Sequence, residues 1–85
     1  MIEFAPQVIL TETEHGVVLL DGDTGGYWIT NGNGAVVVRS LARDGTAADA
    51  ATALRAANPS LDGDIAARDV AALLDELRRS GLVLP

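Results

Sequence analysis

A hairpin signature in residues 17–31 constrains the fold of this chain more than any other feature. Val17 to Leu20 is a short apolar run with high strand propensity. The next residues after Asp21 read Gly-Asp-Thr-Gly, a turn composition in which glycine adopts positive φ and aspartate bonds its own backbone. The second arm carries the only tyrosine and the only tryptophan of the protein, Tyr27 and Trp28. Two aromatic side chains on one short strand indicate either core packing or a binding edge.

The length and charge of the chain exclude several classes of function. A length of 85 residues predicts one small domain, and 12 acidic against 6 basic side chains give a formal net charge of −6. This charge argues against nucleic acid and against an anionic membrane as partners, because both attract clustered Lys and Arg. The absence of cysteine excludes disulfides and thiolate sites. No apolar run approaches the ~20 residues of a membrane span and no signal peptide is visible, so we expect a cytoplasmic protein.

The sequence contains no convincing catalytic or metal-binding motif. His15 is the only histidine and lies in a predicted turn, so it has no partner for a metal site or a catalytic dyad. The segment from Asp21 opens like a calcium loop, but glycines stand at later ligand positions. The Gly32-x-Gly34 pair lacks the third glycine of a dinucleotide fingerprint. We therefore predict no enzyme activity, no metal and no cofactor.

The first half of the chain predicts a three-stranded antiparallel meander. Strands are expected over about residues 7–13, 16–21 and 26–30, joined by short turns. Residues 1–6 form a short lead-in, which ends at a proline.

The segment after Thr30 is compatible with two structures. Its Asn-Gly pairs followed by Val36, Val37 and Val38 favour a fourth strand, since Asn-Gly is a strong local hairpin signal. Alternatively, Asn31 or Asn33 caps a helix in which Val37 and Leu41 lie at i and i+4. Local sequence alone does not decide between the two.

Two further helices follow. Thr46 is expected to cap a helix over about residues 46–57, which ends before Pro59. Asp64 is expected to cap the last helix, over about residues 64–80. Its apolar stripe has residues three and four positions apart, namely Ala66, Val70, Leu73, Leu74 and Leu77. The closing segment Leu82-Val83-Leu84 is expected to pack back on the fold or to add a strand.

From Leu20 to Ala35 the sequence resembles the PqqD-like family of RiPP recognition elements, which hold the leader peptides of ribosomally made, post-translationally modified peptides. The family pattern is roughly Leu-Asp, a turn, then Gly-x-Tyr-x-x-Leu-Asn-x-x-Gly. The matching positions are Leu20-Asp21, Gly25, Tyr27, Asn31 and Gly34. Thr30 departs, where leucine is usual, and Asn33 stands where Thr or Ser is common. Further matches are Leu41, Gly45-Thr46, Asp69-Val70, Leu73-Leu74, Leu77 and Gly81-Leu82-Val83.

The resemblance implies an α+β, winged-helix-like fold with a three-stranded antiparallel sheet followed by three helices. It therefore favours a helix over about residues 33–43 in place of a fourth strand. It implies a non-catalytic adaptor that binds the leader of a precursor peptide by strand addition to the third strand. The adaptor would deliver that leader to a separate leader peptidase, with the cyclase as a further candidate. The length and the Val-Leu-Leu-Asp start resemble the stand-alone proteins of lasso-peptide clusters.

In the family the leader lies between the third strand and the last helix. The candidate peptide-binding residues implied here are Gly26, Tyr27, Trp28, Ile29, Thr30, Asp69, Val70, Leu73, Leu74, Glu76 and Leu77. Lasso leaders in related systems carry a Tyr-x-x-Pro element, which implies a small apolar pocket as its receptor. On the helix, Asp69 and Glu76 lie on one flank and Arg78 on the other, and the sequence does not determine which flank faces the leader.

Strand alternation divides the aromatic arm between the two faces of the sheet. Tyr27 and Ile29 share one face, while Trp28 and Thr30 share the other. One pair is therefore expected to pack inward and the other to stay accessible.

Two other functions remain compatible with the same architecture. One is a PqqD-type peptide chaperone that serves a radical enzyme in another pathway. The other is a winged-helix nucleic-acid-binding module, against which the net charge of −6 argues.

Overall fold

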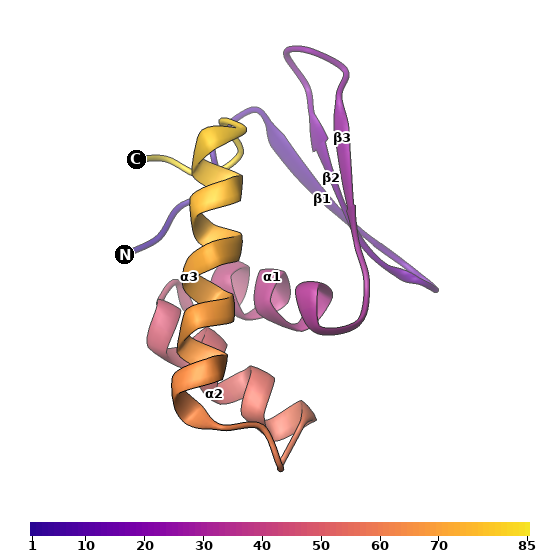
Figure 1. The fold of residues 1–85 in the computed structure, drawn as a ribbon. Coiled ribbons are helices and arrows are strands. Elements are labelled where there is room, and N and C mark those ends of the chain that lie inside the picture. The colour runs from indigo at the N-terminus through magenta and orange to yellow at the C-terminus, as the bar shows by residue number, and fades with distance from the viewer.

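The sheet is a three-stranded antiparallel meander in the order β1-β2-β3 (Figure 1). The structure, a computed structural model, describes residues 1–85. The strands are β1 (Val8–Thr13), β2 (Gly16–Asp21) and β3 (Tyr27–Thr30). In register, Leu19 of β2 faces Leu10 on one side and Trp28 on the other. Only β2 therefore has both edges paired, and β1 and β3 are the two edge strands.

The turn between β2 and β3 is held by the aspartate that ends β2. The Asp21 carboxylate accepts the N–H groups of Asp23 at 2.9 Å and Thr24 at 3.3 Å. Gly25 has a φ of 74°, a left-handed conformation that favours glycine. The predicted turn chemistry thus explains why β3 returns alongside β2 at this position.

The three helices follow the sheet, as the resemblance implies, and the α+β fold class is confirmed. They are α1 (Gly32–Asp44), α2 (Ala47–Ala57) and α3 (Gly63–Arg79). Figure 1 shows α3 running along the front of the molecule, with α1 behind it and the sheet to one side. The helices cover one face of the sheet only, since α1 packs against β2 and β3.

The segment after Thr30 is a helix rather than a fourth strand. Val37, Val38 and Leu41 are all buried, and their helical spacing directs them together into the core. A strand would have turned successive valines to opposite faces and exposed one of them. Gly45, with a φ of 77°, ends the helix and donates its N–H to the Leu41 carbonyl at 3.0 Å.

One predicted cap is right and one is wrong. The Thr46 hydroxyl accepts the Asp49 N–H at 3.0 Å, as expected for the start of α2. The cap of α3 is Asp62 and not Asp64, because the helix already begins at Gly63. The Asp62 carboxylate accepts the Asp64 N–H at 2.8 Å, which leaves Asp64 in the first turn, where its charge favours the helix dipole.

The two ends of the chain pair with each other. The Ala5 N–H donates to the Leu82 carbonyl at 2.9 Å, and the Leu84 N–H donates to the Glu3 carbonyl at 2.9 Å. Phe4 and Val83 form an isolated antiparallel bridge between these segments. The closing segment therefore packs back, as predicted, but its partner is the lead-in, to which the sequence assigned no structural role.

The core lies between the inner face of the sheet and the three helices. Its buried residues are Val17, Leu19, Ala35, Val37, Val38, Leu41, Ala50, Leu54, Ala66, Val70, Leu74, Leu77, Leu82 and Val83. Glu12 and Arg39 add a polar link at the rim, where the guanidinium donates to the carboxylate at 2.8 Å from Nε and 2.9 Å from Nη2. This link joins β1 to α1, and the hydrogen bond from Arg39 lowers the pKa of Glu12 below its usual range.

Gly16, at the start of β2, lies so close to the backbone of Thr30 that a larger residue there is expected to destabilise the fold. Its φ is 154°, and a Cβ at this position would collide with the backbone carbonyl oxygen of Thr30. We expect Gly16→Ala to lower the free energy of unfolding by more than Gly25→Ala. The latter meets no atom within 4 Å, so its cost is only the left-handed backbone, about 1–2 kcal/mol. Urea denaturation of both variants tests this, and equal losses would contradict it.

Candidate functional site

The outer edge of β3 has no strand beside it. The Asp21 N–H donates to the Gly26 carbonyl at 2.8 Å, which fixes the phase of the antiparallel ladder. Hydrogen-bonded pairs alternate along such a ladder, so the N–H and C=O groups of Trp28 point toward β2. Those of Tyr27 and Ile29 point away from it, and neither residue takes part in a backbone bond outside the ladder. The edge therefore offers two donors and two acceptors in the spacing that a further strand requires.

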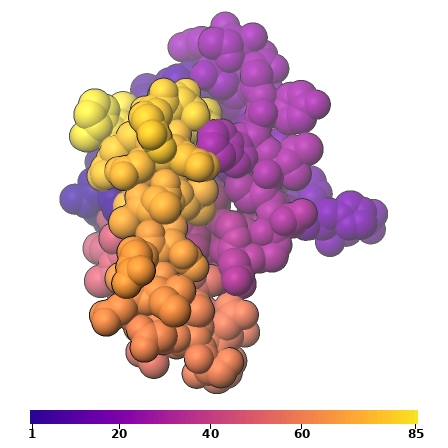
Figure 2. All heavy atoms as spheres, in the orientation of Figure 1, coloured from indigo at the N-terminus to yellow at the C-terminus, as the bar shows by residue number.

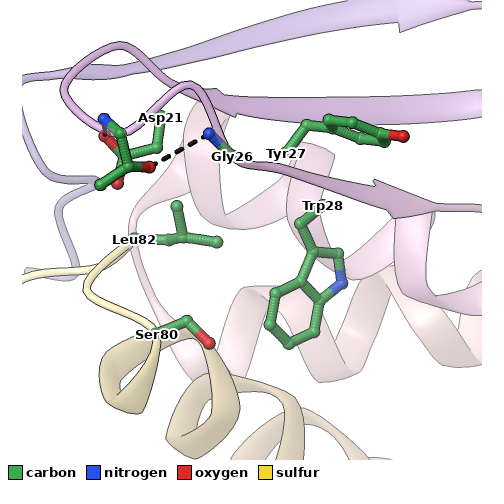
Figure 3. A pocket seen from close by; sticks show the side chains of 7 residues that line it. Asp21, Gly26, Tyr27, Trp28, Ser80 and Leu82 are labelled. Atoms are coloured by element: carbon green, nitrogen blue, oxygen red, sulfur yellow. Dashed lines mark hydrogen bonds between the residues drawn. The ribbon is translucent and has the colours of Figure 1, made fainter.

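A cavity of about 160 Å³ lies beside this edge. Its lining residues are Asp21, Thr24, Gly26, Tyr27, Trp28, Ser80 and Leu82. Figure 3 shows the Trp28 ring directed from β3 toward the end of α3, while the Tyr27 side chain points away from the cavity. Figure 2 shows the surrounding surface, which is hollowed between the yellow and orange atoms of α3 and the magenta atoms of β3. We call the cavity and the surface between β3 and α3 the β3–α3 cleft.

The cleft exists because α3 does not pack along β3. The helix packs against α2 and makes no extended contact with the strand. Trp28, half-buried and packed against the core, occupies the space between them. Its indole N–H donates no hydrogen bond within the chain, although it is not a buried unsatisfied group. The tryptophan thus forms an apolar floor with one polar atom open to solvent.

The flank of α3 that faces β3 is identified by Ser80, the residue directly after the helix. Ser80 lines the cavity together with Trp28. Residues Asp69, Leu73, Glu76 and Ser80 are four, three and four positions apart, so they form one continuous stripe. Helical periodicity thus puts Asp69 and Glu76 on the flank of α3 that continues from Ser80, on the side of the cavity. Leu73 is half-buried between this stripe and the core.

The predicted site residues fall into two groups. Gly26, Tyr27, Ile29, Asp69 and Glu76 are exposed, and Trp28 and Leu73 are half-buried at the cleft. The other four, Thr30, Val70, Leu74 and Leu77, are buried. These four support the cleft from beneath, and their side chains present no surface to a ligand.

Thr30 has a specific structural role, which explains its departure from the family pattern. Its hydroxyl donates to the Val17 carbonyl at 2.8 Å in a buried position. A leucine at this position would add apolar volume to the core, whereas threonine satisfies its polar group within the β2–β3 ladder. The substitution therefore changes packing below the strand and leaves the outer edge of β3 unaltered.

Four residues of the cavity were missed by the sequence analysis, namely Asp21, Thr24, Ser80 and Leu82. Asp21 and Thr24 belong to the β2–β3 turn, and their residue types are explained by the turn alone, so nothing in the sequence indicated that they also line the cavity. Ser80 and Leu82 reach the cavity because the chain turns back after α3 at Gly81, with a φ of 75°. Glycine directly after a helix was a visible signal for that turn, but it carried no information on what the turn contacts.

The opposite face of the sheet carries exposed apolar side chains. Tyr27 is 70% exposed, Ile29 is 62% exposed and Ile9 is 54% exposed. The register places Ile9, Leu20 and Tyr27 in one row across the sheet and Thr11, Val18 and Ile29 in the next. We call these two rows the outer sheet face. The strand alternates as predicted: Tyr27 and Ile29 lie on the outer face of the sheet, and Trp28 and Thr30 lie on the inner face.

The structure shows neither a metal-binding cluster nor a membrane-spanning helix. No three His, Asp or Glu side chains lie together in a way that could hold a metal ion. His15 is exposed at the β1–β2 turn, with Nε2 3.3 Å from the carboxylate of Glu14. None of the helices has the length and apolar character needed to cross a membrane.

Comparison with known proteins places this geometry in a family. The family model described as coenzyme PQQ synthesis protein D (PqqD) matches residues 16–83. The chain belongs to the PqqD family. The match begins at β2 and ends at the terminal bridge, so the β3–α3 cleft of this PqqD-family chain lies wholly within it. Among curated protein sequences, none matches the chain significantly.

Two solved structures are similar over almost the whole chain. One is a lasso peptide synthetase B1 complexed with the leader peptide, with a TM-score of 0.86 and 33% identity, covering 99% of this chain and 98% of that one. The other is TbiB1 in complex with the TbiA(β) leader peptide, with a TM-score of 0.84 and 25% identity, covering 96% of this chain and 94% of that one. The resemblance to PqqD-like recognition elements is thereby confirmed.

The packing of Trp28 predicts that this residue of the cleft also stabilises the fold. A fully buried tryptophan replaced by alanine costs about 3–5 kcal/mol, and Trp28 is half-buried. We expect Trp28→Ala to lower the free energy of unfolding by about 2 kcal/mol. The exposed neighbour supplies the control, since Tyr27→Ala loses only cross-strand contacts worth less than about 1 kcal/mol. Urea denaturation followed by circular dichroism measures both, and similar losses would place Trp28 outside the core.

Proposed function

We propose that this chain is a non-catalytic adaptor that binds the leader segment of a ribosomal precursor peptide, in the biosynthesis of a lasso peptide. The observation that carries the proposal is the free edge of β3 next to the β3–α3 cleft, in a fold shared with a lasso peptide synthetase B1 and with TbiB1, each complexed with a leader peptide. The similarity to a lasso peptide synthetase B1 favours this pathway over a peptide chaperone for a radical enzyme.

The geometry supports binding by strand addition. A leader lying along β3 would accept from the N–H groups of Tyr27 and Ile29 and donate to their carbonyls, which supplies affinity without reading side chains. Alternate leader side chains would point into the cleft, toward Trp28 and Leu73. The cavity of about 160 Å³ is large enough for one apolar side chain of the kind that a Tyr-x-x-Pro element would provide.

The test is a titration with the leader encoded beside this protein, followed by anisotropy of a labelled peptide and by Trp28 fluorescence. We expect saturable binding in the micromolar range or tighter, with a change in Trp28 emission, since the ring forms the floor of the cleft. Folded protein that binds no co-encoded leader would refute the proposal.

The free edge predicts the effect of proline at Ile29. Because the Ile29 N–H points away from β2, Ile29→Pro removes a donor from the edge and leaves the β2–β3 ladder intact. We expect leader affinity to fall about tenfold or more, through the lost bond and the ring beside the added strand.

Ile29→Ala is the matched control, because it removes the side chain and keeps the N–H. It should bind the leader within about threefold of the parent protein. Thermal melts by circular dichroism establish that both variants fold. If folded Ile29→Pro bound as well as Ile29→Ala, strand addition at β3 would be wrong.

We further propose that the adaptor presents its leader to a separate leader peptidase through the outer sheet face. Exposed apolar surface on one side of a sheet favours contact with a protein partner. Tyr27 and Ile29 link the two sites, since their backbone groups form the free edge and their side chains belong to the outer sheet face. A partner docked there would lie next to the bound leader, and tethering would raise the local concentration of the scissile segment.

Ile9 separates docking from leader binding, because it lies on β1, two strands away from the free edge. We expect Ile9→Lys to retain leader affinity and to slow leader cleavage by the co-encoded peptidase about tenfold. Ala71→Lys, exposed on the flank of α3 that carries Arg78, adds the same charge away from both surfaces and should leave leader affinity and cleavage unchanged. Normal cleavage with Ile9→Lys would remove the outer sheet face as the docking surface.

A further inference from the structure

The wall of the cleft formed by α3 carries negative charge. Asp69 and Glu76 are exposed on the stripe that ends at Ser80, and Asp21 lines the cavity from the opposite side. The two helix carboxylates are seven residues apart, about 10 Å along the helix axis. Both lie on the same flank as Leu73, so the negative charge borders the apolar floor of the cleft.

No basic side chain of the protein neutralises this wall. The three ion pairs of the structure involve Glu12, Glu14 and Asp44, all outside the cleft. Arg78 lies on the far flank of α3, and Arg68 and Arg79 lie on its outward side. The Asp21 carboxylate accepts two N–H groups of its own turn, yet those bonds leave its charge in place.

A strand added to β3 would direct every second side chain toward this wall. A short apolar side chain there would meet Trp28, Leu73 or Leu82. A lysine or arginine would lay its aliphatic stem over the Trp28–Leu73 floor and extend its charged end to Glu76 or Asp69. An acidic side chain in the same position would face two carboxylates, neither of which is held in an ion pair.

We propose that the α3 wall selects for charge: the cleft takes a leader whose side chains facing α3 include Lys or Arg, and it discriminates against Asp and Glu there. Glu76, one turn before Ser80, is the principal determinant, and Asp69 extends the selection toward the other end of the cleft. The proposal rests on the proposed leader binding and adds the chemical class that the cleft recognises. Backbone pairing supplies sequence-independent affinity, while the wall supplies discrimination between peptides.

The first arm of the test changes the peptide. The probe is the fluorescein-labelled synthetic leader of the precursor encoded beside this protein, together with variants in which each Lys or Arg is replaced by Glu. In the segment that pairs with β3, we expect about a five- to tenfold loss of affinity at positions that face α3. The effect should alternate with a period of two and shrink as salt is raised.

The second arm changes the protein. Glu76→Lys should weaken binding of the parent leader about five- to tenfold, and Asp69→Lys should weaken it less. Asp75→Lys is the matched control, since it makes the same charge change on α3 but lies about 100° around the helix, on the side away from β3. It should bind the parent leader within about twofold of the unaltered protein.

Exchanging the charges of the leader side chain and of residue 76 tests whether these two groups are in contact. The leader variant with Glu at the most sensitive position should regain affinity for Glu76→Lys and not for Asp75→Lys. A uniform loss with all three Lys variants would mean that net charge alone acts, and the proposal would be wrong. It would also be wrong if the bound segment held no Lys or Arg, or if Glu76→Lys bound the parent leader normally.

The outcomes separate this proposal from the proposed function. Normal leader binding by Glu76→Lys would overturn the charge selection and leave the adaptor function standing. Loss of binding in the unaltered protein for every co-encoded leader would overturn both. All three variants replace exposed side chains, and melting curves by circular dichroism verify that they fold.

Discussion

The burial of Val17 and Leu19 holds the sheet on the helices, and the rest of the structure depends on it. Both side chains lie on the inner face of β2, the one strand with two paired edges. They fix the register of the strands on either side, because a slip of one residue would turn a buried valine and leucine into solvent. That register places Trp28 opposite Leu19 on the inner face and Tyr27 and Ile29 on the outer one. The site is therefore set by the core.

The same packing explains why an edge of the sheet is left open in so small a protein. An unpaired strand edge invites aggregation, and most proteins shorten or cover it. Here β3 is only four residues long, and Trp28 lies beside the cavity between it and the end of α3. A helix packed directly on β3 would protect the edge and remove the cleft. The structure instead keeps a short, accessible edge bounded by a charged helix flank.

Much of this arrangement follows from local sequence. The hairpin, the apolar stripe of the last helix and the Thr46 cap all rest on interactions within a few residues, and each is present. After Thr30 the local sequence was compatible with either a strand or a helix, and tertiary packing decides between them. The segment with Val37, Val38 and Leu41 is a helix because that conformation buries all three side chains in the core. This burial depends on distant segments and is not visible in the local sequence. Asp64 was the expected cap of the last helix, but α3 begins at Gly63 and Asp62 takes that role.

The sequence and the family resemblance placed the candidate site between the third strand and the last helix, but the residues that line its cavity depend on contacts between distant segments. Ser80 and Leu82 reach the cavity because the chain turns back after α3 and pairs with the lead-in at Ala5. Four of the predicted residues are buried, because an apolar stripe on a helix gives the same pattern whether it forms a core or a cleft wall. The orientation of the stripe becomes known only when Ser80 is seen beside Trp28.

The two faces of β3 give one short strand three separate surfaces. Its outer edge offers backbone groups, which recognise any extended peptide. Its inner face borders the apolar floor and the acidic wall, to which we assign the discrimination between peptides. Its outer face presents Tyr27 and Ile29, which are both exposed, and the Tyr27 side chain points away from the cavity (Figure 3). A peptide on the edge would extend the sheet by a strand and would place its own outward side chains beside these two. Any partner that contacts the outer sheet face near β3 would then meet adaptor and peptide together, and it would bind the loaded protein more tightly than the empty one.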